Sequence, residues 1–258
     1  MRSTTPVAEL PGIRVGCAGW SLPRAQWPRF PAEGSHLERY AARFDAAEID
    51  TSFYRPHRMQ TYARWAAATP PQFRFAVKLP KAITHEARLA GARDALDAFL
   101  GEVEGLGPKL GCLLIQLAPS HAFDATVLRR FLADLRRRHE GPVAIEPRHA
   151  SWFAPEADAL LARERVARVL ADPVLHPGGE WPGGWPQLVY LRLHGRPRTY
   201  WSAYDEALLA RLALRLQQAR DDGAACWCIL DNTAGGEAVG NALTLKARLP
   251  HQTHQETT

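Results

Sequence analysis

Charged side chains end several apolar, strand-like runs of this sequence, and their types suit acid/base chemistry. In VAIEPR, Val143 and Ile145 alternate with Ala144, Glu146 and Arg148. Alternate residues of a strand share a face, so Glu146 and Arg148 lie on the face opposite the aliphatic pair. Buried charges must pair with one another or with a ligand. The pattern therefore predicts a polar site where strands end.

The same rule applies to the other strand-like runs. It places Tyr190, Arg192 and His194 on one face of VYLRLHG and Lys78 on the less aliphatic face of FRFAVKL. The polar residues at or near the ends of these runs are Glu48, Asp50, Lys78, Gln116, Glu146, Arg148, Asp172, Arg192, His194, Asp231 and Asn232. Arg74 and Arg168 lie earlier in their runs, where structural salt bridges are expected.

Acid/base catalysis on an anionic substrate is the chemistry that this set permits. Glu146, His194 and Glu48 are the candidate catalytic residues, because carboxylates and an imidazole with a near-neutral pKa transfer protons. The predicted anion contacts are Lys78, Arg148 and Arg192. A structural His194, simply paired with Glu146, remains an open alternative. The other candidate substrate contacts are Gln116, Asp50, Tyr54, Trp152, Tyr200, Asp172, Asp231 and Asn232.

Strand-like and helical patterns alternate along the 258 residues. Eight apolar runs begin near residues 13, 46, 73, 110, 142, 166, 187 and 225. This alternation predicts α/β topology in a single (β/α)8 barrel over residues 12–250, with an open doubly wound sheet as the alternative. After the sixth run, Pro173 to Pro186 is rich in Pro, Gly and Trp, which predicts a loop in place of a helix and a candidate lid. Residues 1–11 and 251–258 are expected to be disordered.

Composition sets bounds on partners and compartment. Hydrophobic residues make up 46% and the formal net charge is +5, which is typical of a globular protein and far below what coating nucleic acid requires. The four cysteines form no C-x-x-C pair, no apolar run reaches about 20 residues, and the first residues lack the apolar core of a signal peptide. We therefore expect a cytoplasmic protein with no membrane partner, and the oligomeric state stays open.

Cofactor motifs are missing from the sequence. It contains no G-x-G-x-x-G, G-x-x-x-x-G-K-[ST], H-E-x-x-H or G-x-S-x-G. The acidic residues and His194 could form an oxygen-rich site for a divalent metal, but the intermingled Lys and Arg would repel the ion. No cofactor is indicated.

An ordered set of short motifs resembles the domain of unknown function 72 family, also called YecE-like. The motifs are GCAGWS, EIDTSFYRPH, FRFAVKLPKAITHE, IQLAPS, VAIEPRHASWF, YLRLHG and ILDNTAGGEAVGNALTL, which together span about Ile13 to Leu249. The resemblance implies a (β/α)8 barrel and no particular reaction. Family positions fall on Glu48, Tyr54, Lys78, Gln116, Glu146, Arg148, Trp152, Arg192, His194 and Gly195. The chain departs from the family pattern at Asp50, Ala118 and Asp231, and the two aspartates make its site more acidic.

Three functions follow as hypotheses. The first is an enzyme, a hydrolase or an isomerase or lyase, that acts on a small phosphorylated or carboxylated metabolite. The second is a metal-dependent, endonuclease-like barrel that processes nucleic acid, which rests on fold analogy alone. The third is a barrel that binds a small ligand without catalysis.

Overall fold

The computed structural model describes residues 12–250, and the expected disordered ends lie outside these residues. Within this part of the chain, ten strands form one sheet, in the order β7-β9-β10-β1-β2-β3-β4-β5-β6-β8. The strands are β1 (Ile13–Ala18), β2 (Ala46–Ile49), β3 (Arg74–Lys78), β4 (Leu110–Gln116), β5 (Val143–Glu146), β6 (Val166–Arg168), β7 (Leu170–Asp172), β8 (Gly183–Gly184), β9 (Leu188–Leu193) and β10 (Ala225–Leu230).

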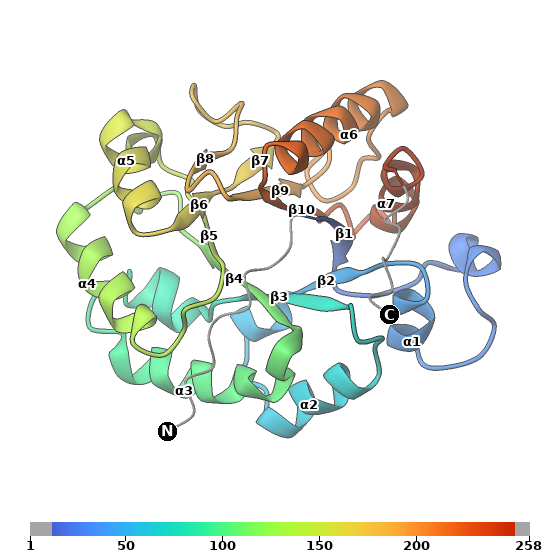
Figure 1. The fold of residues 1–258 in the computed structure, drawn as a ribbon, viewed down its shortest axis with the longest axis horizontal. Helices are drawn as coiled ribbons and strands as arrows, with labels where there is room; N and C mark the ends of the chain where they lie inside the picture. The colour runs from blue at the N-terminus through green and yellow to red at the C-terminus, as the bar shows by residue number, and fades with distance from the viewer. Residues whose placement is uncertain (1–11, 251–258) are drawn as a thin grey trace.

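The sheet curls into a nearly closed barrel of mostly parallel strands, with helices around its outside (Figure 1). The sixth predicted strand is interrupted at Val169. Its first half, β6, pairs with β5, and its second half, β7, pairs with β9. This division brings the two ends of the sheet together. The fold class is therefore the expected one, although ten strands are present and the count of eight is not confirmed.

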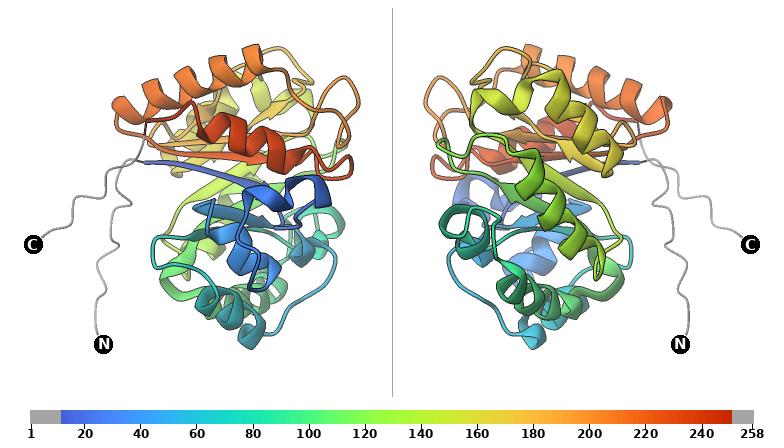
Figure 2. Two further views of the ribbon diagram at one scale, coloured as in Figure 1. Left: turned by 90° about the vertical axis from the view of Figure 1, so that its right-hand side faces the viewer. Right: turned by 90° about the vertical axis from the view of Figure 1, so that its left-hand side faces the viewer.

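Seven α-helices of the described residues cover the barrel. Side views show helices packed along the outer faces of the strands (Figure 2). They are α1 (His36–Ala41), α2 (Met59–Ala67), α3 (Arg93–Val103), α4 (Ala125–Arg136), α5 (Pro155–Arg163), α6 (Glu206–Asp221) and α7 (Ala238–Lys246). Short helical turns follow several strands, among them η2 (Thr51–Phe53), η3 (Ala82–Glu86) and η5 (Ala150–Phe153). Within residues 12–250, no helix has the length and apolar character that crossing a bilayer requires.

The predicted loop between the sixth and seventh runs is present. Residues 173–186 contain no helix and only the two-residue strand β8, which pairs antiparallel with β6. A Cβ on Gly184 would lie 2.4 Å from the carbonyl oxygen of Val166, so only glycine permits this close approach. The loop therefore replaces the helix that would follow the sixth run, while α5 packs against β6.

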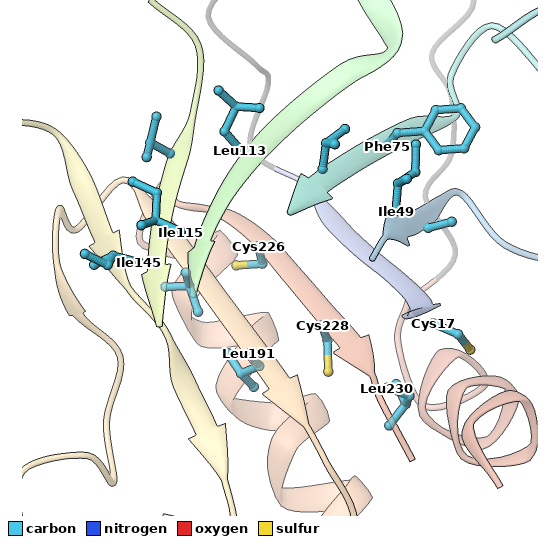
Figure 3. Close-up of a cluster of buried hydrophobic side chains, with 14 of the residues drawn as sticks. Cys17, Ile49, Phe75, Leu113, Ile115, Ile145, Leu191, Cys226, Cys228 and Leu230 are labelled. Atoms are coloured by element: carbon cyan, nitrogen blue, oxygen red, sulfur yellow. The ribbon is translucent and has the colours of Figure 1, made fainter. Parts of the chain in front are cut away.

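Two apolar clusters correspond to the two faces of the sheet. The outer cluster joins strand residues to the helices and includes Cys17, Ile49, Phe75, Ile145 and Leu191, which come from β1, β2, β3, β5 and β9 (Figure 3). The inner cluster consists largely of the alternate residues, among them Ala46, Ala76, Cys112, Leu114, Ala144, Tyr190, Trp227 and Ile229. The residues of both clusters are buried, so the interior of the barrel is a packed core. The polar site must therefore lie above the inner cluster, at the carboxyl ends of the strands.

Candidate functional site

Arg192 on β9 is the centre of the site and is fully buried. Its Nη2 lies 2.5 Å from Glu48 Oε1 on β2, and its Nη1 lies 2.6 Å from Glu146 Oε2 on β5. The same guanidinium approaches Asp231 Oδ2 at 3.1 Å and Asp50 Oδ2 at 3.4 Å. Three separate segments, the ends of β2, β5 and β10, thus direct four carboxylates at one cation, which offsets the large desolvation penalty of burying it.

His194, two residues beyond Arg192 on the same face, links two of these carboxylates. Its Nδ1 lies 2.9 Å from Asp231 Oδ2 and its Nε2 lies 3.0 Å from Glu146 Oε1. As an imidazolium, His194 would donate to both. Burial lowers the pKa of His194, but the neighbouring Glu146 and Asp231 outweigh it and raise the pKa above its ordinary value. The geometry therefore favours a protonated imidazole.

Arg148 lies at the edge of this cluster, with its side chain 15% exposed. It forms an ion pair with Glu146, and its Nη2 is 3.0 Å from His194 Nε2. Nε2 can accept from Arg148 only when it carries no proton, and can donate to Glu146 only when it does. Arg148 and a proton on His194 therefore compete for the same nitrogen.

The two buried glutamates have opposite acidities although they share Arg192. Burial raises the pKa of Glu48 to about 7; Arg192 opposes this shift, whereas Asp50 adds to it. Burial acts in the same direction on Glu146, but Arg192, His194 and Arg148 together hold its pKa well below the ordinary range. One carboxyl can thus keep a proton near neutral pH while the other stays ionised, which is the arrangement of an acid and a base.

Tyr190 belongs to this site, although it is absent from the predicted site residues. Its hydroxyl donates a 2.7 Å hydrogen bond to Glu48 Oε2. Tyr190 has the same parity in β9 as Arg192 and His194, so the alternation rule already placed it on the inward face. Because tyrosine is a largely apolar residue, its presence in the strand did not indicate a site residue. Its ring stacks on Trp227.

Lys78 is separated from this network. It is 7% exposed, and its Nζ lies 4.3 Å from the centroid of the Phe53 ring. Within residues 12–250 its ammonium forms no ion pair or side-chain hydrogen bond. The nearby His85 is a second basic group, and its pKa is lowered by burial and by Lys78 and Lys81. A buried cation without a carboxylate partner is a candidate contact for an anionic ligand.

Gln116 and Tyr200 also lie at the mouth. Gln116 is half-buried and in register with Glu146 on the neighbouring strand. Tyr200 follows β9, is 42% exposed, and places its ring edge-on to the His194 ring, with centroids 5.7 Å apart. Both therefore remain candidate ligand contacts.

Four predicted contacts are not brought into the network. Asp172, at the end of β7, lies 3.6 Å from Arg196, and Asn232, just after β10, donates to the Ser202 carbonyl and to Asn241. Trp152 is fully buried and donates to the His121 carbonyl. Tyr54 is 79% exposed, at the rim, against Phe53.

Arg192 also differs from its predicted part as an anion contact. Its guanidinium is enclosed by carboxylates and a ligand cannot reach it without displacing them. In the structure its guanidinium forms ion pairs with Glu48 and Glu146. Arg168, expected to be structural, forms a two-point ion pair with Asp158 on α5, on the outer side of the sheet.

The acidic side chains of the mouth contact Arg192 and His194. Among the described residues, no group of three or more His, Cys, Asp or Glu side chains is arranged to hold a metal ion. A cavity of about 240 Å³ lies beside the mouth, between the end of β1 and the β10–α7 loop, and is lined by residues that include Ala18, Gly19, Thr233 and Gly236. The Gly19 amide donates to the Glu48 carbonyl at 2.8 Å, so this cavity adjoins the network.

The fold and the position of the site define a mostly parallel α/β barrel with ionisable groups at the carboxyl ends of its strands. The model of the family described as "Protein of unknown function DUF72" matches residues 14–258, and the chain belongs to this family. The resemblance seen in the sequence motifs is therefore confirmed.

Relatives of known sequence and structure agree with this membership. The UPF0759 protein YecE of Escherichia coli K12 is 32% identical over 166 residues, which cover 62% of this chain and 59% of that protein. The UPF0759 protein YunF of Bacillus subtilis 168 is 23% identical, with 89% and 92% covered.

Two crystal structures of DUF72 family proteins share the fold. EF0366 of Enterococcus faecalis V583 has a TM-score of 0.79 at 23% identity, over 92% of this chain and 95% of that one. TM1631 of Thermotoga maritima MSB8 has a TM-score of 0.74 at 24% identity, over 91% and 98%. At these identities the likeness concerns the fold alone.

Proposed function

We propose that this protein is an enzyme that transfers protons on a small anionic metabolite, phosphorylated or carboxylated, as a hydrolase or an isomerase or lyase. The observation that carries the proposal is the pair of buried glutamates on Arg192, with the pKa of Glu48 raised to about 7 and that of Glu146 lowered. Divergent acidities in one cluster are typical of acid/base sites.

Each residue has a defined part in this chemistry. Ionised Glu146 is the base, and His194, between Glu146 and Asp231, is the acid that returns the proton. Protonated Glu48 is a second proton donor, and Arg192 and Tyr190 hold it in place. Lys78 and Arg148 are the anion contacts, because Lys78 has no carboxylate partner and Arg148 reaches the surface. The substrate would thus place its anion towards β3 and its reacting carbon towards β5 and β9.

A metabolite screen tests the catalytic part. The purified protein is incubated with phosphorylated and carboxylated metabolites, and consumption is followed by mass spectrometry. We expect Glu146→Gln and His194→Ala to slow turnover by about 10²- to 10⁴-fold, the usual contribution of acid/base groups. Glu206→Gln, at a carboxylate on the surface of α6, is the matched control. Full turnover by Glu146→Gln would contradict the assigned roles.

Thermal shift with phosphate or citrate tests the anion contact. A ligand that binds the folded state raises the melting temperature, and Lys78→Met should abolish that rise whereas Lys81→Met, at an exposed lysine paired with Glu86, should keep it. A ligand that stabilises the protein yet is recovered unchanged would favour the binding barrel without catalysis. Salt-dependent retardation of DNA in a gel would favour the nucleic-acid alternative instead.

A further inference from the structure

Tyr200 has an unusual backbone conformation for its residue type. Its φ is +69°, in the left-handed region that only a small fraction of residues other than glycine adopt. Such strain persists only where surrounding contacts enforce it, and it concentrates at functional sites. The contacts that hold the Tyr200 backbone and the residues next to its side chain therefore bear on its function.

Two backbone hydrogen bonds fix Tyr200 between the two strand ends that carry the site. Its amide donates to the His194 carbonyl at 2.5 Å, and its carbonyl accepts from the Gly235 amide at 3.2 Å. A Cβ on Gly235 would lie 2.1 Å from the Trp201 carbonyl oxygen, so the loop after β9 packs directly on the loop after β10. The backbone at residue 200 is thus held from both sides.

The side chain, by contrast, is partly exposed. Tyr200 is 42% exposed, and its ring meets the His194 ring edge-on, at 86° between planes. Burial raises the pKa of the Tyr200 phenol, with nearby Asp231 acting in the same direction. The side chain therefore lies against His194 while part of its surface remains in solvent.

His194 is 1% exposed although it lies at the very end of its strand. Glu146, Asp231 and Arg148 surround its two nitrogens, and the Tyr200 ring lies edge-on to its ring, with the centroids 5.7 Å apart. Of these neighbours, Tyr200 is the most exposed and the one with no ion pair to break.

We propose that Tyr200 is the gate of the site: its ring shields His194 and Glu146 from solvent, and ligands reach them when the side chain turns outward. The strained backbone holds the ring over His194. Access to His194 is separate from the reaction, so this gate can exist whether or not the proposed acid/base chemistry is correct.

Carbethoxylation of histidines by diethyl pyrocarbonate measures this access directly. Modification of each histidine is quantified by peptide mass spectrometry, with exposed His36 as the internal reference. In the wild type we expect His194 to react far more slowly than His36. Tyr200→Gly should raise the His194 rate about tenfold, which corresponds to about 1.4 kcal/mol of protection. Glycine accepts a positive φ, so this variant should fold normally.

Two matched variants make the outcome decisive. Tyr200→Phe keeps the ring and should react as slowly as the wild type, and Trp201→Ala, at the exposed neighbour, should leave the His194 rate unchanged. Rates are compared from about pH 6 to pH 8, to separate access from a changed imidazole pKa. An unchanged His194 rate in Tyr200→Gly would overturn the proposal, as would an equal rise in Trp201→Ala or in Tyr200→Phe.

Discussion

The two sides of the barrel mouth differ in whether their buried cations have carboxylate partners. On the side formed by β2, β5, β9 and β10, four carboxylates surround Arg192, and every cation has partners. On the β3 side, Lys78 lies over an aromatic ring without a carboxylate. A closed ion-pair network holds its own groups in position, whereas an unpaired buried cation can still bind an anion. The paired side is therefore suited to chemistry and the unpaired side to ligand binding.

Removing the centre of the paired side should have the largest effect. Arg192→Met leaves Glu48 and Glu146 buried without their cation, and we expect a loss of about 3–5 kcal/mol in the free energy of unfolding. Urea denaturation measures it. Arg137→Met, at a surface pair with Asp134, should cost less than about 1 kcal/mol. Equal, small losses in the two variants would mean that the network contributes nothing to the fold.

The raised pKa of Glu48 should appear in the pH dependence of stability. Folding raises this pKa from its ordinary 4.5 to about 7, so the folded state holds the extra proton. The resulting stabilisation is present below about pH 4.5 and is lost as the pH rises to about 7, by roughly 3 kcal/mol. Glu48→Gln should remove this decline. Urea titrations at several pH values measure the difference, and parallel curves for wild type and variant would refute the assignment.

His194 should respond to its acidic partners. Its pKa is raised in the folded state, so its stabilising proton is present below the unfolded value and lost as the pH rises through the folded one. Asp231→Asn removes one partner and should lower that pKa. Histidine Cε1–H chemical shifts followed by NMR report it, with Glu206→Gln as the control. A His194 titration that is the same in Asp231→Asn would show that the contact between Nδ1 and Asp231 does not affect the pKa of His194.

The smallest effect is expected on the β3 side. Lys78→Met removes a charge that has no ion pair to lose and keeps an apolar stem over Phe53, so the free energy of unfolding should change by less than about 1 kcal/mol. Lys78→Met and Arg192→Met should therefore differ strongly in their free energy of unfolding. A loss as large as that of Arg192→Met would reveal that Lys78 is a member of the network.

Strand parity predicted the convergence of Glu48, Glu146, Arg192 and His194, because each is an inward residue at the end of a regular parallel strand. Parity also places Arg168 on the outer face, with Val166 and Leu170, where it pairs with Asp158. The surroundings of Asp172, Asn232 and Tyr200 depend on loops that fold back on the mouth, where no periodic pattern applies. The sequence also could not assign opposite acidities to two glutamates, because these arise from burial and from neighbours distant in the chain.

The protonation states of Glu48 and Glu146 test most directly whether the two carboxyls around Arg192 have opposite acidities. In protein labelled with ¹³C at the glutamate carboxyl carbons, Glu48→Gln and Glu146→Gln identify the two signals, and each is titrated by NMR. We expect the Glu48 carboxyl to titrate at about pH 7 and the Glu146 carboxyl to stay ionised well below pH 4.5. Two carboxyls that titrate together near the ordinary glutamate value would contradict an acid and a base held on one arginine.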